Sequence, residues 1–306
     1  MFKKILLIVL GIGLSALPAY AAKGDGGEAG AFLKMGAGAR ALGMGKAFVA
    51  LADDATASYW NPAGLTQIKG HNLCLMYSEP FDKVDGISYS LVSYAQPIPK
   101  GSIGVSLIYL NVDGLKERVN ATDPPGKDFG NKEMALLLSY ATEIKQVISV
   151  GATLKGISQE IDSNKGNGFG LDLGMLYRPT QLSDLRIGVV LTNLIRADIR
   201  GDKMPLALRL GVASHFFGDR LHLSLGTDFI SDREVKGHFG AEYELFRSLL
   251  LRAGYSTDNE EITGGIGFKV KQFSIDYAYG AAYSSGESGE DLDLGGTHRV
   301  SLGANF

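Results

Sequence analysis

The chain has 306 residues, a formal net charge of −3 and a pI near 6.0, so it lacks the basic surface that nucleic-acid-binding proteins need. Its single cysteine excludes an internal disulfide. Mean hydropathy is slightly positive at +0.06, and 41 glycines accompany 13 tyrosines and 14 phenylalanines. Beyond the N-terminus, however, no segment is apolar for the roughly 18 residues that a spanning helix requires.

Residues 1–21 have the three parts of a secretory signal peptide. Lys3 and Lys4 form a basic start, residues 5–14 are apolar, and residues 19–21 (AYA) match a small-x-small cleavage site. A membrane-anchoring helix is the alternative, but the apolar run is too short to cross a bilayer. We therefore expect cleavage after this site and export from the cytoplasm of a bacterium.

Residues 22–69 show no strand periodicity and are too polar to cross a membrane. A helix-like patch covers about residues 39–51, two aspartates follow, and the run NPAG at 61–64 has the composition of a turn. A segment of this kind ahead of a barrel is most economically accommodated inside it. We therefore predict that residues 22–69 form a partly helical plug in the lumen of a barrel.

The predicted plug contains two sets of candidate functional residues. The turn set consists of Asp53, Asp54, Asn61, Pro62 and Gly64. We expect its polar side chains to hold the plug through hydrogen bonds to buried backbone, with Pro62 fixing its own φ angle. Alternatively, the turn shifts to open a path, and the two roles are compatible. The apolar set, Leu42, Met44, Phe48 and Val49, is a candidate lining for a hydrophobic ligand.

From residue 70 to residue 306, apolar and polar residues alternate in segments of about ten, separated by turns. The stretch 221–229 (LHLSLGTDF) is typical, because its leucines and Phe229 share one face while Ser224 and Asp228 lie on the other. This period indicates half-apolar strands. The predicted strands, with boundaries good to about two to four residues, are 71–78, 86–96, 102–111, 132–142, 147–157, 168–178, 185–195, 204–214, 221–230, 237–246, 249–256, 261–270, 272–280 and 296–306.

The connections between these strands alternate between short turns and mostly longer polar loops, as in outer-membrane barrels. Only helices and closed barrels satisfy their backbone hydrogen bonds in lipid. We therefore predict an all-β fold, a transmembrane antiparallel β-barrel of about 14 strands over residues 70–306 in the bacterial outer membrane. The even strand number places both termini in the periplasm. A secreted β-sandwich with alternating strands is the alternative.

The two faces of the predicted wall have different requirements. Lipid-facing positions must be apolar, because a Lys or Arg at the bilayer midplane costs about 2–4 kcal/mol. The polar residues that we expect to face the lumen are Asp172, Arg209, Asp228, Glu242 and Arg252. Many glycines share this inner face and leave room for a plug.

The last predicted strand places Val300, Leu302, Ala304 and Phe306 toward lipid. This strand must close the barrel against the first one, so it should be paired to its end. An aromatic residue at the end of such a strand resembles the signal that the barrel-assembly machinery recognises. The expected partners are therefore outer-membrane lipid and, during insertion, that machinery.

The segment GMGKAFVALADDATASYWNPAGL (43–65) resembles the N-terminal signature shared by FadL-type transporters and the PorV/PorQ family. The preceding run AGAFLKMGAGARALGMG (29–45) is more similar to PorV/PorQ. The resemblance implies a fourteen-stranded barrel with an N-terminal hatch inside. FadL-type proteins let hydrophobic molecules such as fatty acids cross the outer membrane, whereas PorV-like proteins bind exported cargo in type IX secretion.

Two functions follow from this resemblance. The longest external candidate loop, residues 112–131, is mostly charged, which weakens capture of lipid. The leading hypothesis is therefore a non-enzymatic PorV/PorQ-type protein that binds or hands over exported proteins, with cargo or secretion components as partners. The alternative is a FadL-like passive channel for small hydrophobic compounds such as fatty acids. A structural or adhesive surface protein is a third possibility.

Motifs for other chemistry are incomplete. Residues 36–41 fit a loose dinucleotide fingerprint, but no strand precedes them. The acidic loop at 287–293 lacks the EF-hand pattern, and the five histidines lie on separate predicted strands or turns. No serine, histidine and acidic residue stand at the spacing of a known catalytic site. We expect no cofactor, no metal and no enzymatic activity.

Overall fold

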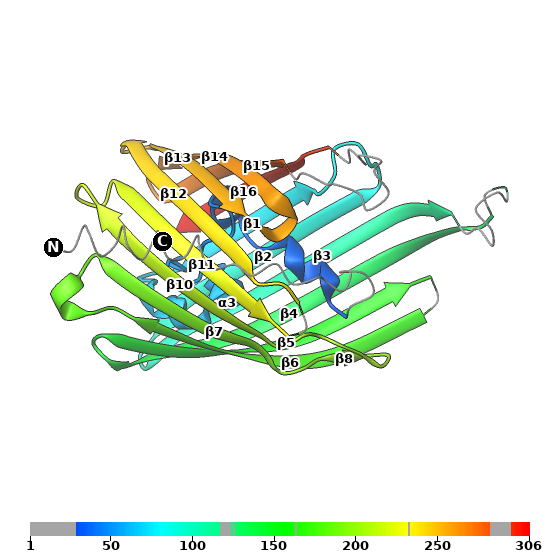
Figure 1. Ribbon diagram of the computed structural model, residues 1–306, viewed down its shortest axis with the longest axis horizontal. Helices are drawn as coiled ribbons and strands as arrows, with labels where there is room; N and C mark the ends of the chain where they lie inside the picture. The colour runs from blue at the N-terminus through cyan, green and yellow to red at the C-terminus, as the bar shows by residue number, and fades with distance from the viewer. Residues whose placement is uncertain (1–28, 117–123, 125, 163, 232, 282–294) are drawn as a thin grey trace.

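The computed structural model describes residues 29–116, 124, 126–162, 164–231, 233–281 and 295–306. In it, a closed antiparallel barrel of fourteen strands surrounds the segment from residue 29 to residue 68 (Figure 1). The predicted signal peptide, residues 1–21, lies outside the described residues. Within the described part of the chain, no helix has the length and apolarity needed to cross a bilayer.

The barrel strands confirm the predicted number and order. They are β1 (Asn72–Glu79), β2 (Ile87–Ile98), β3 (Gly101–Lys116), β4 (Asp128–Lys145), β5 (Ile148–Ile161), β6 (Asn164–Tyr177), β7 (Leu185–Ile195), β10 (Ala207–Phe216), β11 (Leu221–Ile230), β12 (Lys236–Phe246), β13 (Leu249–Ser256), β14 (Glu261–Val270), β15 (Phe273–Ala281) and β16 (Thr297–Asn305). A separate hairpin, β8 (Asp198–Ile199) and β9 (Asp202–Lys203), stands between β7 and β10.

The predicted loop at 112–131 is shorter than expected. β3 and β4 continue through a bulge to the pairs Leu115↔Phe129 and Lys116↔Asp128. The ends of β3 and β4 pair through their backbones although their side chains are partly polar and do not form an apolar outer face. The wall is therefore taller over β3–β6 than elsewhere, as the long strands in Figure 1 show.

The barrel closes between β1 and β16, as the alternation at the end of the chain predicted. Leu73 pairs with Ala304, and Asn72 with Asn305. Beyond the strands, the backbone N–H of His71 donates to the carbonyl of Phe306 at 2.7 Å, and that of Phe306 donates to His71 at 2.9 Å. Every rung of this seam is used, which a wall in lipid requires.

The outer face of the wall is apolar and its inner face is covered by the plug. Val300 and Leu302 are 44% and 49% exposed, whereas Ser301 between them is buried. The same alternation runs along the other strands, with exposed Leu, Tyr and Phe outside and buried small or polar residues inside. The core of the protein is therefore the plug and the surface against which it packs.

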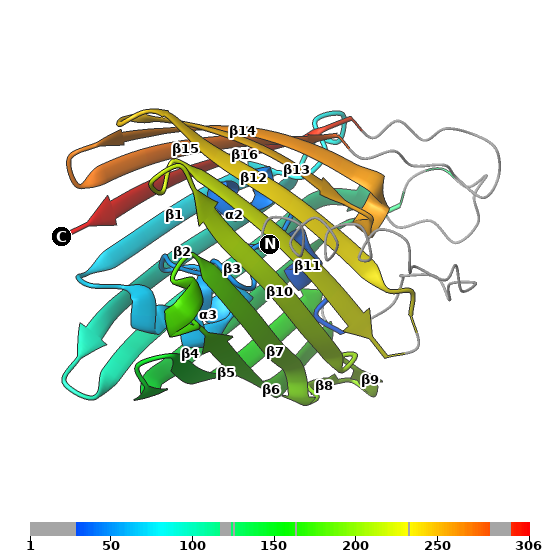
Figure 2. The same ribbon diagram turned by 60° about the vertical axis from the view of Figure 1, so that its left-hand side comes forward.

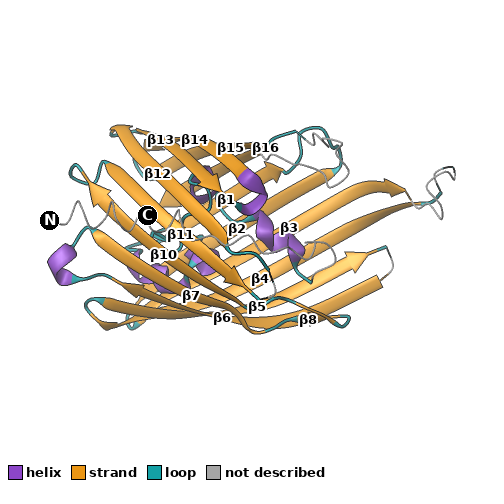
Figure 3. Ribbon diagram, viewed as in Figure 1, coloured by secondary structure: helices purple, strands orange, loops and turns teal. Residues whose placement is uncertain are grey.

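The plug consists of short helical pieces joined by turns (Figure 3). They are the 3₁₀-helix η1 (Ala31–Met35), the α-helices α2 (Ala39–Gly43) and α3 (Ala57–Trp60), and the 3₁₀-helix η2 (Pro62–Gln67). The helix expected at 39–51 ends at Gly43, because Gly45 and Lys46 adopt left-handed φ angles of 61° and 66° that a right-handed helix excludes.

Glycines on the inner face let the backbone of the plug approach the wall. A Cβ added at Gly211 would lie 2.9 Å from the backbone nitrogen of Ala50, and one at Gly151 would lie 2.6 Å from the carbonyl carbon of Pro62. At Gly254 it would overlap the backbone of the segment that follows α2. These positions need glycine for space, and they fix the depth at which the plug lies.

We predict that Gly254→Ala displaces the plug and destabilises the barrel by about 1–3 kcal/mol, the usual cost of overfilling a packed core. Gly264→Ala on the adjacent strand is the matched control, since a Cβ there meets nothing within 4 Å. Urea unfolding in detergent, followed by tyrosine fluorescence, measures both. Equal midpoints for the two variants would show that the plug does not depend on this approach.

Candidate functional site

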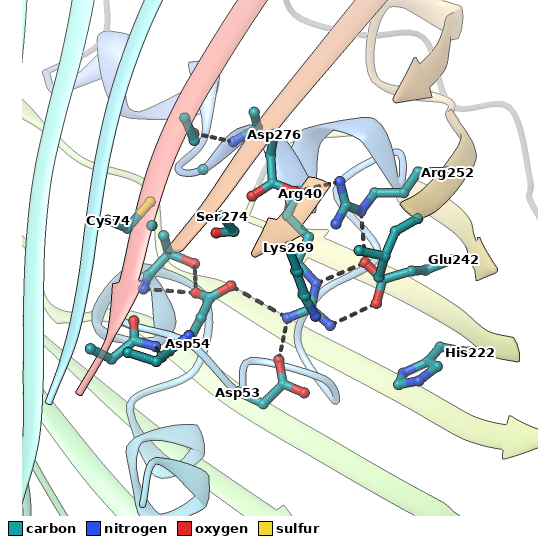
Figure 4. Close-up of a pocket in the computed structure, with 18 of the residues that line it drawn as sticks. Arg40, Asp53, Asp54, Cys74, His222, Glu242, Arg252, Lys269, Ser274 and Asp276 are labelled. Carbon is teal, nitrogen blue, oxygen red and sulfur yellow. Dashed lines mark hydrogen bonds and ion pairs between the residues drawn. The ribbon is translucent and has the colours of Figure 1, made fainter. Parts of the chain in front are cut away.

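An ion network joins the plug to the wall at the end of the barrel where the turns are short (Figure 4). Arg40, on α2, donates from Nε and Nη2 to the two carboxylate oxygens of Glu242 on β12, each at 2.9 Å. Its Nη1 lies 2.6 Å from an oxygen of Asp53. Arg252 donates to Glu242 at 2.6 Å and lies 2.8 Å from Asp276. One guanidinium thus binds a wall carboxylate bidentately and a plug carboxylate as well.

The two adjacent aspartates of the plug differ in their electrostatics. Burial raises the pKa of Asp53, but the charges of Arg40 and of Arg186, 3.5 Å away, lower it by more, so its pKa is below the ordinary value. Burial raises the pKa of Asp54, and the charge of Asp53 adds to the rise. Thr56 donates to Asp54 from its backbone N–H at 2.9 Å and from its hydroxyl at 2.5 Å. Arg40 also lies 3.5 Å from Asp54, so both aspartates pair with it, Asp53 more closely, and Asp54 is in addition held by Thr56.

The NPAG turn is bound to both the plug and the wall. The amide nitrogen of Asn61 donates to the carbonyl of Val49 at 2.9 Å and to that of Met175, on β6, at 3.1 Å. Its side-chain oxygen accepts from the N–H of Ala63 at 3.1 Å, which caps the start of η2. Gly64 has no room for a Cβ against the backbone of the plug itself. Asn61 binds backbone groups, Asp53 binds arginines, and Asp54 binds Thr56 and lies 3.5 Å from Arg40.

The structure places Asp172, Arg209, Asp228, Glu242 and Arg252 on the inner side of the wall. Asp172 lies 2.7 Å from the ammonium of Lys155, and Arg209 lies 3.2 Å from Asp228. Buried charges are tolerated only when they are paired, and these residues are. The polar interior is therefore a set of ion pairs distributed around the plug.

An inner cavity of about 270 Å³ lies beside the Arg40 network, at the short-turn end. Six acidic and four basic residues line it, together with the backbone of β1 and β16. Figure 4 shows the carboxylates of Asp53 and Asp54 on one side and Arg252 and Lys269 on the other. The lining is polar and mixed in charge, which suits water and ions better than an apolar ligand.

Three further cavities, here called the outer chamber, lie on the opposite side of the plug. Their volumes are about 90, 50 and 270 Å³, and Lys34 on η1 borders all three. Leu33, Leu42, Met76 and Phe81 supply apolar wall. Among the described residues that line the chamber, seven are basic and four are acidic. This chamber combines apolar surface with an excess of positive charge.

Helix α2 separates the inner cavity from the outer chamber. Arg40 borders the inner cavity, and Leu42, two residues further, borders the largest outer cavity. The helix is held by the Arg40 pairs and by a hydrogen bond of 2.9 Å from the N–H of Ala39 to the hydroxyl of Ser301. Thr263 donates to the carbonyl of Gly43 at 3.2 Å. A shift of α2 is therefore one way to connect the inner cavity with the largest cavity of the outer chamber.

Of the apolar residues predicted as ligand contacts, Leu42 borders a described cavity. Met44, Phe48 and Val49 border none of the cavities described above and are buried in packing contacts. Met44 and Val49 lie over wall glycines, and Phe48 packs edge-on against Trp60 with ring centroids 6.2 Å apart. These three residues hold the shape of the plug.

Several residues of the site were not predicted from the sequence. Arg40 and Lys34 are the charged residues of a run otherwise rich in Gly, Ala and apolar residues, and a charge in such a run signals a buried pair. Lys155 lies at an inward position of an alternating strand, where it pairs with Asp172. The alternation of the last strand does predict that Arg299 faces the lumen, and there it pairs with Glu261 at 2.7 Å. The alternation of apolar and polar residues along each strand is the sequence signal that identifies these inward positions.

Within the described residues, no three or more His, Cys, Asp or Glu side chains are grouped so as to hold a metal ion. The acidic loop at 287–293 lies outside the described residues. His215 and His222 do stack across β10 and β11, with ring centroids 4.2 Å apart.

Searches found no family model and no curated protein that match the sequence. Solved structures do match its fold. The CymD monoaromatic hydrocarbon channel is similar with a TM-score of 0.66 at 16% identity, covering 89% of this chain and 98% of that one. The Pseudomonas putida toluene transporter TodX has a TM-score of 0.62 at 14% identity, covering 88% and 96%. A Pseudomonas aeruginosa FadL homologue has 0.61 at 13%, covering 86% and 97%.

These likenesses establish the fold as that of the FadL-type barrels, over nearly the whole length of the compared chains. They agree with the coarser part of the resemblance drawn from residues 43–65.

We predict that the two adjacent aspartates respond oppositely to neutralisation. At pH 7, Asp53→Asn should destabilise the protein by about 1.5–3 kcal/mol, because Arg40 loses a charged hydrogen bond. Asp54→Asn should be neutral or stabilising, since an amide can still accept from Thr56, a buried carboxylate is removed, and Arg40 loses only its 3.5 Å contact while it keeps Asp53 and Glu242. Urea unfolding of the purified barrel at pH 7, pH 5 and pH 3 measures both variants.

The dependence on pH follows from the two pKa shifts. The folded pKa of Asp53 is depressed below 3.8, so its contribution is present above that value and the deficit of Asp53→Asn should persist to about pH 4 and shrink below it. The folded pKa of Asp54 is raised, so ionisation costs stability as the pH rises and any gain of Asp54→Asn should grow toward pH 7. Identical pH profiles for both variants would contradict the assignment.

Proposed function

We propose that this protein is a non-enzymatic, passive outer-membrane channel for small hydrophobic compounds, including those with a carboxylate group such as fatty acids. The observation that carries the proposal is the outer chamber, an apolar-walled space with excess positive charge above a plug that closes the barrel. Structural neighbours named as a toluene transporter and a monoaromatic hydrocarbon channel support it.

The charge of the chamber favours an anionic end on the ligand. Lys34 borders each of the three cavities. Burial lowers the pKa of Lys34; the nearby Asp258 raises it, and the charge of Lys46 lowers it further. A carboxylate placed among these cations would gain charge-assisted hydrogen bonds, and its chain would cover apolar wall. The inner cavity has more acidic than basic residues. The electrostatic attraction of an anionic ligand therefore does not continue past α2.

Passage then depends on the plug. A compound in the outer chamber meets Leu42, and the far side of the same helix is held by Arg40. A shift of α2 connects the two spaces, and it must break the Arg40–Glu242 pair and the hydrogen bonds that join α2 to Ser301 and Thr263. The turn around Asn61 stays bound to β6 and serves as the fixed end of the plug.

The orientation and the finer family placement belong to the same proposal. We place the short-turn end, where Phe306 lies, in the periplasm, with outer-membrane lipid around the wall and the assembly machinery as the partner during insertion. The first described residues, Ala29 and Gly30, border the outer chamber instead, which does not favour the predicted position of the N-terminus at the periplasmic end. The run at 29–45 supports the PorV/PorQ branch of this fold. The hypothesis of cargo hand-over relied on the loop at 112–131, much of which is strand or lies outside the described residues, and the neighbours support the channel better.

The single tryptophan provides the test, because Trp60 borders one cavity of the outer chamber. We predict that 8-bromooctanoate and 4-bromotoluene quench its fluorescence saturably in the purified protein. Lys34→Met should weaken the bromooctanoate about tenfold, the effect of losing roughly 1.4 kcal/mol, and leave 4-bromotoluene unchanged. Lys132→Met, at an exposed position of β4, is the matched control. Absence of saturable quenching by either probe would refute the channel.

A further inference from the structure

The connection between β7 and β10 folds into the barrel mouth. In the β8–β9 hairpin, Ala197 and Ile199 point inward and are 0% and 3% exposed, and Met204 just beyond is also buried. The tip, Arg200 and Gly201, is exposed and adopts left-handed φ angles of 61° and 96°, as a tight two-residue turn requires. The hairpin therefore has an apolar underside and a polar outer face.

This hairpin stands where the wall has a notch. β7 stops at Ile195, opposite Leu171, while β6 continues outward to Asn164. Figure 2 shows β8 and β9 beyond the ends of β7 and β10, next to β6. Among the described strands, β8 and β9 form a sheet of two that pairs only with itself. Side-chain packing, not a hydrogen-bonded ladder, completes the wall here.

The surface beneath the hairpin is glycine backbone. Gly168 and Gly166 of β6 lie directly under Ala197 and Ile199, and a Cβ at Gly168 would lie 3.1 Å from that of Ala197. On the plug side, Met204 covers Gly30, whose added Cβ would be 3.0 Å from the methionine methyl carbon. The hairpin thus packs closely on this backbone, but among the described strands no ladder hydrogen bonds join it to β6, and an isolated hairpin is only marginally stable in water.

The neck of the hairpin is tied more firmly. Asn193, in a left-handed conformation, donates from its side chain to the carbonyl of Pro205 at 2.7 Å. Arg196 donates to the carbonyl of Met204 at 2.7 Å, and the N–H of Met204 donates to Ala197 at 3.0 Å. The hairpin is thus braced within itself and at its base, so it is suited to move as one piece.

Met204, which directly follows β9, connects the hairpin to one cavity of the outer chamber. This cavity has a volume of about 90 Å³, and Pro205, Leu137 and Leu33 also border it. A dry protein cavity that accommodates benzene measures about 150 Å³. With the hairpin down, a single aromatic ring does not fit, so binding of such a ring requires the hairpin to lift.

We propose that the β8–β9 hairpin is a lid that lifts from Gly166 and Gly168 to admit compact apolar molecules, of about the size of one ring, to this cavity. The identity of the molecule admitted rests on the proposed function, whereas the movement of the lid does not. The hinge lies at Asn193 and Pro205, and the wall of β6 stays in place.

The movement is tested without any ligand. In a Cys74→Ser background, Ala197→Cys is treated with N-ethylmaleimide in the folded protein, and Ala135→Cys, equally buried on β4, is the control. We expect position 197 to react at least tenfold faster than position 135. Ile199→Cys serves as a second variant if Ala197→Cys folds poorly. Equal, slow labelling of the lid and wall positions would overturn the proposal.

A disulfide tests whether the lid controls access. The Gly168→Cys/Ala197→Cys pair starts with its Cβ atoms at 3.1 Å, close to the roughly 3.5–4.5 Å of a disulfide. When oxidised, it should slow quenching of Trp60 by 4-bromotoluene at least tenfold, and dithiothreitol should restore the rate. Lys116→Cys/Asp128→Cys, a cross-strand pair outside the lid, should have no effect.

The outcomes separate the two proposals. An unchanged quenching rate in the oxidised lid variant overturns the lid as the access route. If 4-bromotoluene quenches neither the wild-type protein nor the variants, the channel fails, and the maleimide labelling still decides whether the lid opens.

Discussion

The structure depends on close approach between the backbone of the plug and the backbone of the wall. At Gly151, Gly211 and Gly254 the inner face has no side chain, so a segment with little regular structure of its own lies directly on the strands. A strand with a side chain at each inward position would leave an aqueous lumen or a layer of side chains. The glycines allow the plug to close a barrel that would otherwise form a pore. The positions of Arg40 and Asn61 follow from the place where the plug packs on the wall.

Electrostatics then gives the closed barrel two different sides. The plug is attached to the wall through buried ion pairs, which add less to stability than to position, because desolvation offsets much of their attraction. The same pairs divide the interior charge unevenly, with positive excess in the outer chamber and negative excess in the inner cavity. Because α2 contributes Arg40 to one space and Leu42 to the other, a five-residue helix separates two chemical environments.

The fold was predictable from the sequence because lipid imposes a strict period of two on each strand, and stretches such as 221–229 show it without interruption. The site was predictable only in part. Asp172 and Glu242 stand at inward strand positions, so the period placed them, but their partners Lys155 and Arg40 could be assigned only once the strands were assembled. The plug shows no regular alternation of apolar and polar residues. Its helix was predicted to be too long, because the left-handed turn at Gly45 and Lys46 depends on contacts with distant strands. The β8–β9 hairpin is too short to give a periodic signal.

The seam between β1 and β16 has a consequence for how the molecule is made. The plug immediately precedes β1 in the sequence, and its helix α2 hydrogen-bonds Ser301 on β16, 262 residues away. The strand that closes the cylinder is thus also the strand against which the plug is anchored. Contacts so distant in sequence form late in folding, because the entropy of the intervening chain must be lost first. Enclosure of the plug and closure of the wall are therefore a single, late, cooperative event, and an unfinished barrel has neither a sealed circumference nor a seated plug.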